Sequence, residues 1–194
     1  MNDVKDGLEV KNTYLTSHFP LISILLFSTS FSLYTEGLVI NKLHDLGIYS
    51  GMTEFISESG IKLTLLFLLM LLFFMVFAAL KLIADTTIEL SLLFFSKDKE
   101  GKELTKIRSG SWLYLVGSAV SVFTFKYILF VLTIVVLVSF GYFIFFVYKV
   151  SSSLSNVGLI GIIFFHMFFW SAFVLSISYA IIKLYNGFIA GLPI

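Results

Sequence analysis

A polar stripe interrupts the apolar run between Ala78 and Phe95, where Lys81, Asp85 and Glu89 follow one another at four-residue steps. Residues four apart lie above one another on a helix, so the three share one face. This pattern is typical of a solvated or headgroup-facing stripe with one intrahelical ion pair. It also suits an ion or proton site, because the two carboxylates repel unless a lysine, a proton or a bound cation relieves them. Both interpretations remain open on the sequence.

Two more ionisable residues stand inside apolar sequence, Lys126 and His166. An ionisable residue within a membrane span is a functional candidate by default. A neutral imidazole that is hydrogen-bonded to a serine or a backbone carbonyl explains His166 equally well. Two carboxylates are too few ligands for a tight metal site, and the chain has no HExxH motif, no G-x-S-x-G elbow and no cysteine. We therefore expect no catalytic site, no metal and no cofactor.

The composition predicts an integral membrane protein. Hydrophobic residues make up 58% of the 194 residues and charged residues only 13%, whereas about 25% are charged in soluble domains. The formal net charge of +1 argues against a nucleic-acid binder. The lipid bilayer is the expected surrounding, and the length suits a single membrane domain over residues 1–194.

Four apolar blocks are each long enough to cross about 30 Å of hydrocarbon as a helix of about 20 residues. The expected fold is all-α, with four transmembrane helices at about 19–40, 62–84, 124–148 and 157–182. The polar leader before the first block is not basic, and no A-x-A-like site follows that block, so we do not expect a cleaved signal peptide. The second and third blocks are longer than a bilayer requires.

The charges in the connections predict the orientation. The loop 97–110 carries five basic residues, namely Lys97, Lys99, Lys102, Lys106 and Arg108. The loop 41–60 carries only Lys42, beside three acidic residues. Because basic loops stay inside, loop 97–110 is expected in the cytoplasm. Four crossings then put both termini in the cytoplasm as well.

The long second and third helices are predicted to form a hairpin that reaches the cytoplasmic surface. Folding them about loop 97–110 brings Lys81 and Lys126 to one level, with Lys126 within about one helical turn of Asp85. The favoured register puts both lysines at the membrane surface. A competing register puts Trp112 to about Ile134 in the membrane and buries Lys126 and the stripe. Whether 112–125 is covered by lipid or by protein stays open.

Small residues at two places have the spacing that allows close helix approach. They are Gly117 with Ser121, and Gly187 with Gly191. The spacing is frequent by chance, so it is a weak signal.

Three stretches of the chain, KNTYLTSHFPL, LFSTSFSLYTEG and AALKLIADTTIELSLLFFSKD, carry a resemblance. They resemble the YufK-like family of small uncharacterised multi-pass membrane proteins from Bacillus-type bacteria, over nearly the whole chain. The resemblance implies a multi-pass protein of the bacterial plasma membrane. It transfers no catalytic residue.

Two classes of function follow from these observations. The first is an accessory or interaction subunit without a catalytic site, whose apolar surfaces and cytoplasmic hairpin hold a membrane-protein partner or organise the membrane. A foreign partner would favour this class, whereas a homo-oligomer would favour the second. The second is a small oligomeric ion- or proton-coupled transporter or channel that uses the Lys81, Asp85 and Glu89 stripe and His166. We favour the first, because the outer half of the second span, Leu63 to Leu80, offers only Thr64 as a polar group.

Overall fold

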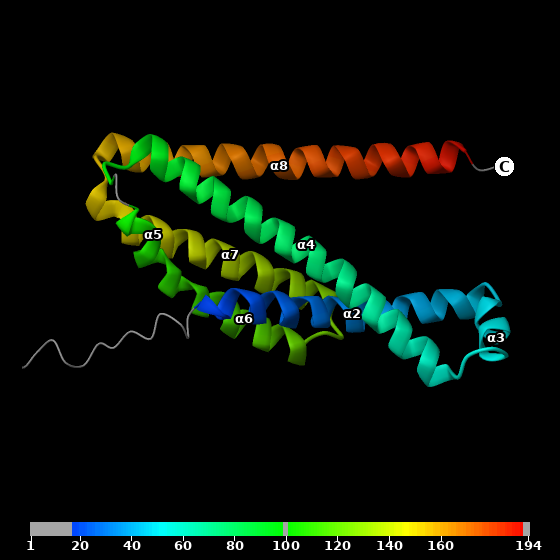
Figure 1. Ribbon diagram of the computed structural model, residues 1–194. Helices are drawn as coiled ribbons and strands as arrows, with labels where there is room; N and C mark the ends of the chain where they lie inside the picture. The colour runs from blue at the N-terminus through cyan, green and yellow to red at the C-terminus, as the bar shows by residue number, and fades with distance from the viewer. Residues whose placement is uncertain (1–16, 99–100, 192–194) are drawn as a thin grey trace, which may run out of the picture.

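The structure is a computed structural model that describes residues 17–98 and 101–191, and these residues are nearly all helical (Figure 1). The helices are α2 (Phe19–Asp45), α3 (Ile48–Thr53), α4 (Glu58–Phe95), α5 (Lys102–Ile107), α6 (Ser111–Phe123), α7 (Ile128–Val150) and α8 (Asn156–Ala190). Two short 3-10 turns, Arg108–Gly110 and Ser151–Ser153, follow α5 and α7.

Local sequence explains where several helices begin. Pro20 lies in the first turn of α2, where its missing N–H costs no hydrogen bond. The Ser57 hydroxyl caps α4 by accepting a hydrogen bond from the Gly60 N–H at 3.2 Å. Gly47 and Gly101 precede α3 and α5 with φ angles of 69° and 72°, in the left-handed region that glycine adopts without strain.

Four segments are long and apolar enough to cross a membrane, which confirms the predicted all-α membrane fold. They are Phe19–Asp45, Glu58–Phe95, Ile128–Ser153 and Asn156–Phe188. The second segment is one continuous helix of 38 residues, about 57 Å long. The charged stripe therefore lies within an unbroken helix.

Helices α6 and α7 form an antiparallel hairpin. The chain reverses between Thr124 and Tyr127, where the Tyr127 N–H donates to the Thr124 carbonyl at 2.9 Å. Gly117 lies so close to Val138 that an added Cβ would overlap the valine side chain, and Gly110 lies in the same way against Tyr142 and Phe145. The hairpin therefore starts and ends at the same end of the molecule (Figure 1).

The hairpin differs from the predicted one, which paired Ser111–Lys126 with the end of the second helix. In the structure α6 packs on α2 and α7 instead. Its face of small residues lets the backbones approach closely, and the Ser121 hydroxyl is 2.8 Å from the Ser30 hydroxyl of α2. Helix α4, in contrast, contacts α2 through large aromatic rings. Phe77 of α4, for example, stacks on Phe27 of α2. The face of small residues on α6 thus packs on α2 and α7, whereas the aromatic face of α4 packs on α2.

The ends of the bundle differ in composition. One end, here called the α5 end, contains α5, the end of α4, the end of α7 and the start of α8, which a backbone bridge from Ser96 to Leu154 holds together. The other end, here called the α3 end, contains α3 and the last described turns of α8 (Figure 1). Helix α2 starts on the α5 side and runs toward α3.

The first and last described helix ends therefore lie toward opposite ends of the molecule, which differs from the arrangement that four crossings predict. The chain termini themselves fall outside the described residues. The reason for the difference is the added pass of α6, which the sequence reading had merged into one long third helix.

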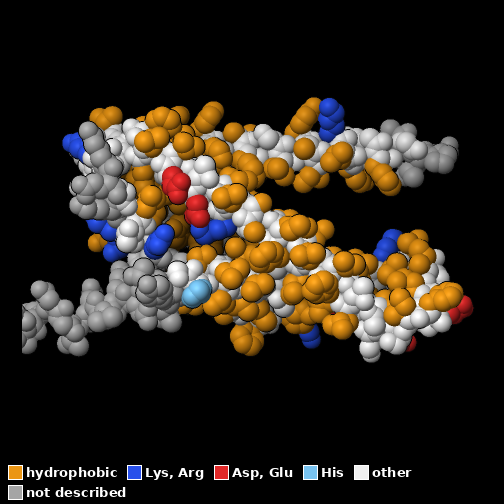
Figure 2. All heavy atoms as spheres, in the orientation of Figure 1, with side chains coloured by type: hydrophobic (Ala, Val, Ile, Leu, Met, Phe, Trp, Pro, Cys, Tyr) orange, Lys and Arg blue, Asp and Glu red, His pale blue; other side chains and the backbone are white. Residues whose placement is uncertain are grey.

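The packed core is small and lies at the α5 end. It consists of Ile88, Leu92, Ile107, Phe146, Val150 and Ile162. Toward the α3 end α8 diverges from the other helices, and Figure 2 shows it standing clear of them over its C-terminal half. Helix α2 also packs closely on α4 and α6, where Phe27 and Ser30 are buried.

Candidate functional site

The charged stripe forms the intrahelical ion pair that its spacing predicts. The Lys81 ammonium donates to both carboxylate oxygens of Asp85. The two side chains are 35% and 45% exposed, so the pair faces the surroundings as well as the bundle. Glu89, one turn further along, is exposed and makes no ion pair with another described residue.

Two tyrosines that sequence reasoning missed complete this polar site. The rings of Tyr114 in α6 and Tyr142 in α7 have their centroids 5.3 Å apart, and both lie close enough to Asp85 for an electrostatic interaction. The site therefore joins α4, α6 and α7. The available signal was the hydroxyl residues inside an otherwise apolar third block.

Lys126 lies far from this site, which corrects its predicted position beside Asp85. It is exposed in the turn between α6 and α7. Tyr114 marks the level of Asp85, and α6 continues for about 14 Å from Tyr114 to Phe123 before the turn that contains Lys126. The prediction failed because the fold-back occurs at Lys126 itself and not only at loop 97–110.

His166 lies in the core between α7 and α8 and is only 4% exposed. Its Nδ1 is 3.0 Å from the Ile162 carbonyl oxygen, so we assign the ring proton to Nδ1. The rings of Phe143, Phe146 and Phe165 lie 5.3 to 5.9 Å from the imidazole, and Nε2 is buried without a partner. A neutral imidazole bonded to a backbone carbonyl is one of the two sequence interpretations. The contacts of His166 do not include the ion pair.

The depth of the Lys81–Asp85 ion pair in the membrane follows from the apolar surface around it. From Ile128 to Tyr148, between Lys126 and Lys149, α7 is about 30 Å long, which equals the thickness of the hydrocarbon core. On α4, exposed apolar side chains lie both before and after the pair, with Met75 57% exposed and Leu93 75% exposed. The pair thus lies inside the apolar band, as in the competing register, although Lys126 lies at the band's edge.

The segment Trp112 to Phe125 is covered in two ways. Its small residues pack against α2 and α7, whereas Val116, Val120 and Phe123 are 52%, 46% and 87% exposed. Protein covers one face, and the other is apolar surface suited to lipid. This answers the question that the sequence left open.

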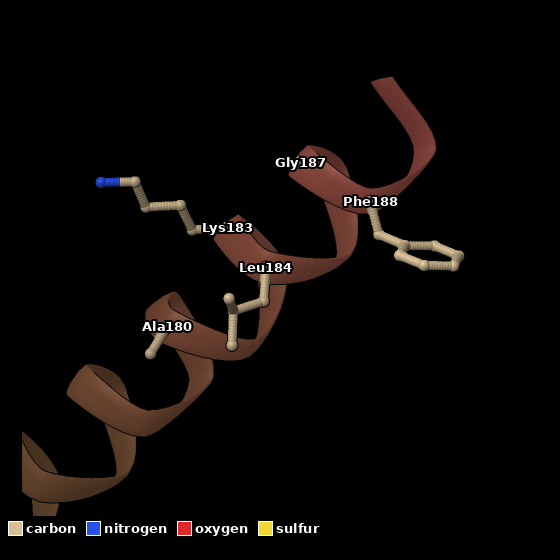
Figure 3. Close-up of a pocket in the computed structure, with 5 residues that line it drawn as sticks. All are labelled: Ala180, Lys183, Leu184, Gly187 and Phe188. Atoms are coloured by element: carbon tan, nitrogen blue, oxygen red, sulfur yellow. The ribbon is translucent and has the colours of Figure 1, made fainter. Parts of the chain in front are cut away.

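Among the described residues, no three histidine, cysteine, aspartate or glutamate side chains lie close enough to hold a metal ion. A shallow surface pocket is lined by Ala180, Lys183, Leu184, Gly187 and Phe188 (Figure 3). All five belong to α8, and Lys183 and Phe188 point to opposite sides of it. This pocket is therefore only the side of one exposed helix. It lies toward the C-terminal end of α8, far from the Lys81–Asp85 ion pair of α4.

Comparison with known proteins identifies a family. Residues 36–193 match the model of DUF5366, a family of unknown function. The chain belongs to this family. It is also 46% identical over 185 residues, 95% of this chain and all of the relative, to the uncharacterized membrane protein YufK of Bacillus subtilis (strain 168). No solved structure matches the chain. The resemblance inferred from the sequence is confirmed, and so is the assignment as a membrane protein.

The family match includes every candidate polar residue, namely Lys81, Asp85, Glu89, Lys126 and His166. Neither the family nor the relative carries a described activity. The function must therefore be argued from the geometry.

Proposed function

We propose that the protein is an accessory or interaction subunit of a membrane-protein assembly and that α8 holds the partner. The observation behind this proposal is the exposure of α8. Every side chain from Val174 to Phe188 is exposed, including Leu175 at 69% and Tyr179 at 67%. Half of a long helix thus has no packing partner among the described residues.

The exposed half of α8 carries hydroxyl groups as well as apolar side chains. Ser171, Ser176, Ser178 and Tyr179 are all exposed. Lipid chains cannot hydrogen-bond these groups, whereas a neighbouring transmembrane helix can. Hydroxyl groups and small residues in the same part of α8 therefore favour a protein partner over lipid alone.

A transport function has weaker support. A conducting path needs polar groups at several depths of the membrane. The described charged groups inside the apolar band gather around Lys81 and Asp85. From Leu63 to Leu80, α4 exposes only apolar side chains such as Leu63, Leu68 and Leu72, apart from Thr64. His166 sits in a cage of rings and not beside the ion pair. These features favour a binding role.

We also propose a revised orientation in the plasma membrane. The α5 end carries Lys97, Lys106, Arg108 and Lys149, so the positive-inside rule assigns this end to the cytoplasm. The N-terminal end of α2 then faces the cytoplasm and the C-terminal end of α8 faces outward. Counting α6, the chain would cross five times.

Site-specific photo-crosslinking in living cells tests the partner proposal. A photoreactive residue at Leu175 on α8 should give a discrete crosslink to a foreign membrane protein. The matched control is Leu72 on α4, which is 48% exposed and should crosslink only to lipid. Purification in mild detergent with mass spectrometry then identifies the partner.

Two results would reject the accessory role. Crosslinks between two differently tagged copies at Leu175 would indicate a homo-oligomer in place of a foreign partner. Lipid adducts alone at both positions would show that α8 is an ordinary lipid-facing helix.

A further inference from the structure

The α5 end gathers basic side chains from three separate parts of the chain. Lys97 follows α4, Lys106 and Arg108 lie in and after α5, and Lys149 lies in the last turn of α7. All four are exposed. They come together because the Ser96–Leu154 bridge and the packing of α5 on α7 join these segments. Figure 2 shows basic side chains gathered at this end.

Most of these cations have no acidic partner in the described part of the chain. Glu103 pairs with Lys106 at 2.6 Å, and an Asp98 carboxylate oxygen accepts the Glu103 backbone N–H at 2.8 Å. Lys97, Arg108 and Lys149 make no ion pair with a described residue, although Lys149 lies 5.6 Å from the centre of the Phe145 ring. Positive charge therefore remains available at the surface.

Exposed aromatic residues mark the same level as a membrane interface. Trp112 is 49% exposed, one turn beyond Arg108, and Tyr148 is 74% exposed, beside Lys149. Tryptophan and tyrosine prefer the headgroup region. Directly toward the α3 end, the surface of α7 becomes apolar, with Ile144 54% exposed and Phe140 61% exposed. Lys97, Arg108 and Lys149 thus lie where the apolar surface ends.

We infer that Lys97, Arg108 and Lys149 form a binding surface for anionic phospholipid headgroups. The lipid phosphate would accept hydrogen bonds from the three cations, and the acyl chains would lie along the apolar faces of α7 and α4. The position at the edge of the apolar band favours a lipid over a free phosphate ion. This inference does not depend on the partner proposed for α8.

The α3 end serves as an internal comparison. On the side of the apolar band away from the α5 end, the described basic residues are Lys42, Lys62, Lys126 and Lys183, and the described acidic residues are Glu36, Asp45, Glu54 and Glu58. The charges there balance, so no net attraction for an anionic lipid is expected. Lys62, exposed near the start of α4, is a suitable control position.

Tryptophan quenching by lipid tests the inference directly, because the chain has only two tryptophans. In a Trp170→Phe background, Trp112 is the sole reporter. The full chain is reconstituted in vesicles of neutral phosphatidylcholine containing brominated phosphatidylglycerol or brominated phosphatidylcholine. We expect the anionic lipid to be preferred about fivefold at Trp112, the effect of about one surface cation. High salt should weaken the preference.

Substitutions test whether the lipid preference depends on the positive charges and not on the fold alone. Arg108→Gln with Lys149→Gln should bring the preference to about one, whereas Arg108→Lys with Lys149→Arg keeps the charge and should keep the preference. Lys62→Gln should change nothing. Equal quenching by both lipids in the parent protein, or a preference that survives the double glutamine variant, would overturn the inference. Loss of the preference in millimolar inorganic phosphate, but not in chloride of equal ionic strength, would reassign the surface to soluble phosphate.

Discussion

At the residue scale, the decisive feature is an ion pair surrounded by apolar surface. A lysine near the middle of a membrane span costs about 3 kcal/mol on insertion scales unless it is paired. Lys81 and Asp85 neutralise each other, so the helix can carry both. Their partial exposure leaves room for water or lipid polar groups, which reduces the cost of the pair and also its net contribution to stability.

The position of this pair predicts unequal effects for two neighbouring neutral substitutions. Asp85→Asn leaves Lys81 without its counter-charge inside the apolar band and should lower the free energy of unfolding by on the order of 2 kcal/mol. Glu89→Gln removes a charge that makes no ion pair with a described residue, so it should leave the free energy of unfolding unchanged or raise it. Thermal unfolding in lipid nanodiscs measures both. Equal shifts for the two variants would argue that the pair is solvated at the membrane surface.

Local pairs were predictable from the sequence, and distant ones were not. The Lys81–Asp85 bond depends only on the four-residue period of a helix. The approach of Tyr114 to Tyr142 depends on where the chain turns, and the misplaced turn also misplaced Lys126. A single sequence shows which face of its helix a residue lies on more reliably than it shows which helix packs against that face.

At the element scale, α6 is the helix that the sequence concealed. It has 13 residues, fewer than a span needs, and it runs into α7 without a glycine or proline at the turn from Thr124 to Tyr127. The apolar pattern therefore reads as one long block. The glycine and serine spacing in α6 did indicate close approach correctly, since Gly117 meets Val138 and Ser121 meets Ser30. Around Gly187, in contrast, an added Cβ would meet nothing within 4 Å.

The tight contact between α6 and α7 predicts a size-dependent substitution effect. Gly117→Ala places a methyl group against the Val138 side chain and should destabilise the protein by about 1–3 kcal/mol. Adding Val138→Ala should restore part of that loss. Gly141→Ala in α7 is the control, because nothing lies within 4 Å of its added Cβ, and it should be neutral or slightly stabilising. If Gly117→Ala behaved like Gly141→Ala in thermal unfolding, the close packing of this hairpin would be contradicted.

At the scale of the whole molecule, the charge distribution and the arrangement of the helices support one orientation. The α5 end carries exposed Trp112, exposed Tyr148 and cations that make no ion pair with a described residue, and the balanced charges of the α3 end lie across the apolar band. The α6–α7 hairpin returns to the α5 end, so α8 starts on the same side as α5. Helix α8 alone then carries the chain to the far side.

This arrangement predicts opposite sides for two reporter fusions in bacterial cells. A reporter that is active only in the cytoplasm should work after Gly101, in the basic connection between α4 and α5. The same reporter after Gly191, at the end of α8, should be silent there, while a reporter active only outside should work. Lys62→Gln at the α3 end should leave both results unchanged and controls for general charge effects. Cytoplasmic activity at both positions would restore the even number of crossings expected from the sequence, and it would require α8 or the α6–α7 hairpin to sit differently in the membrane.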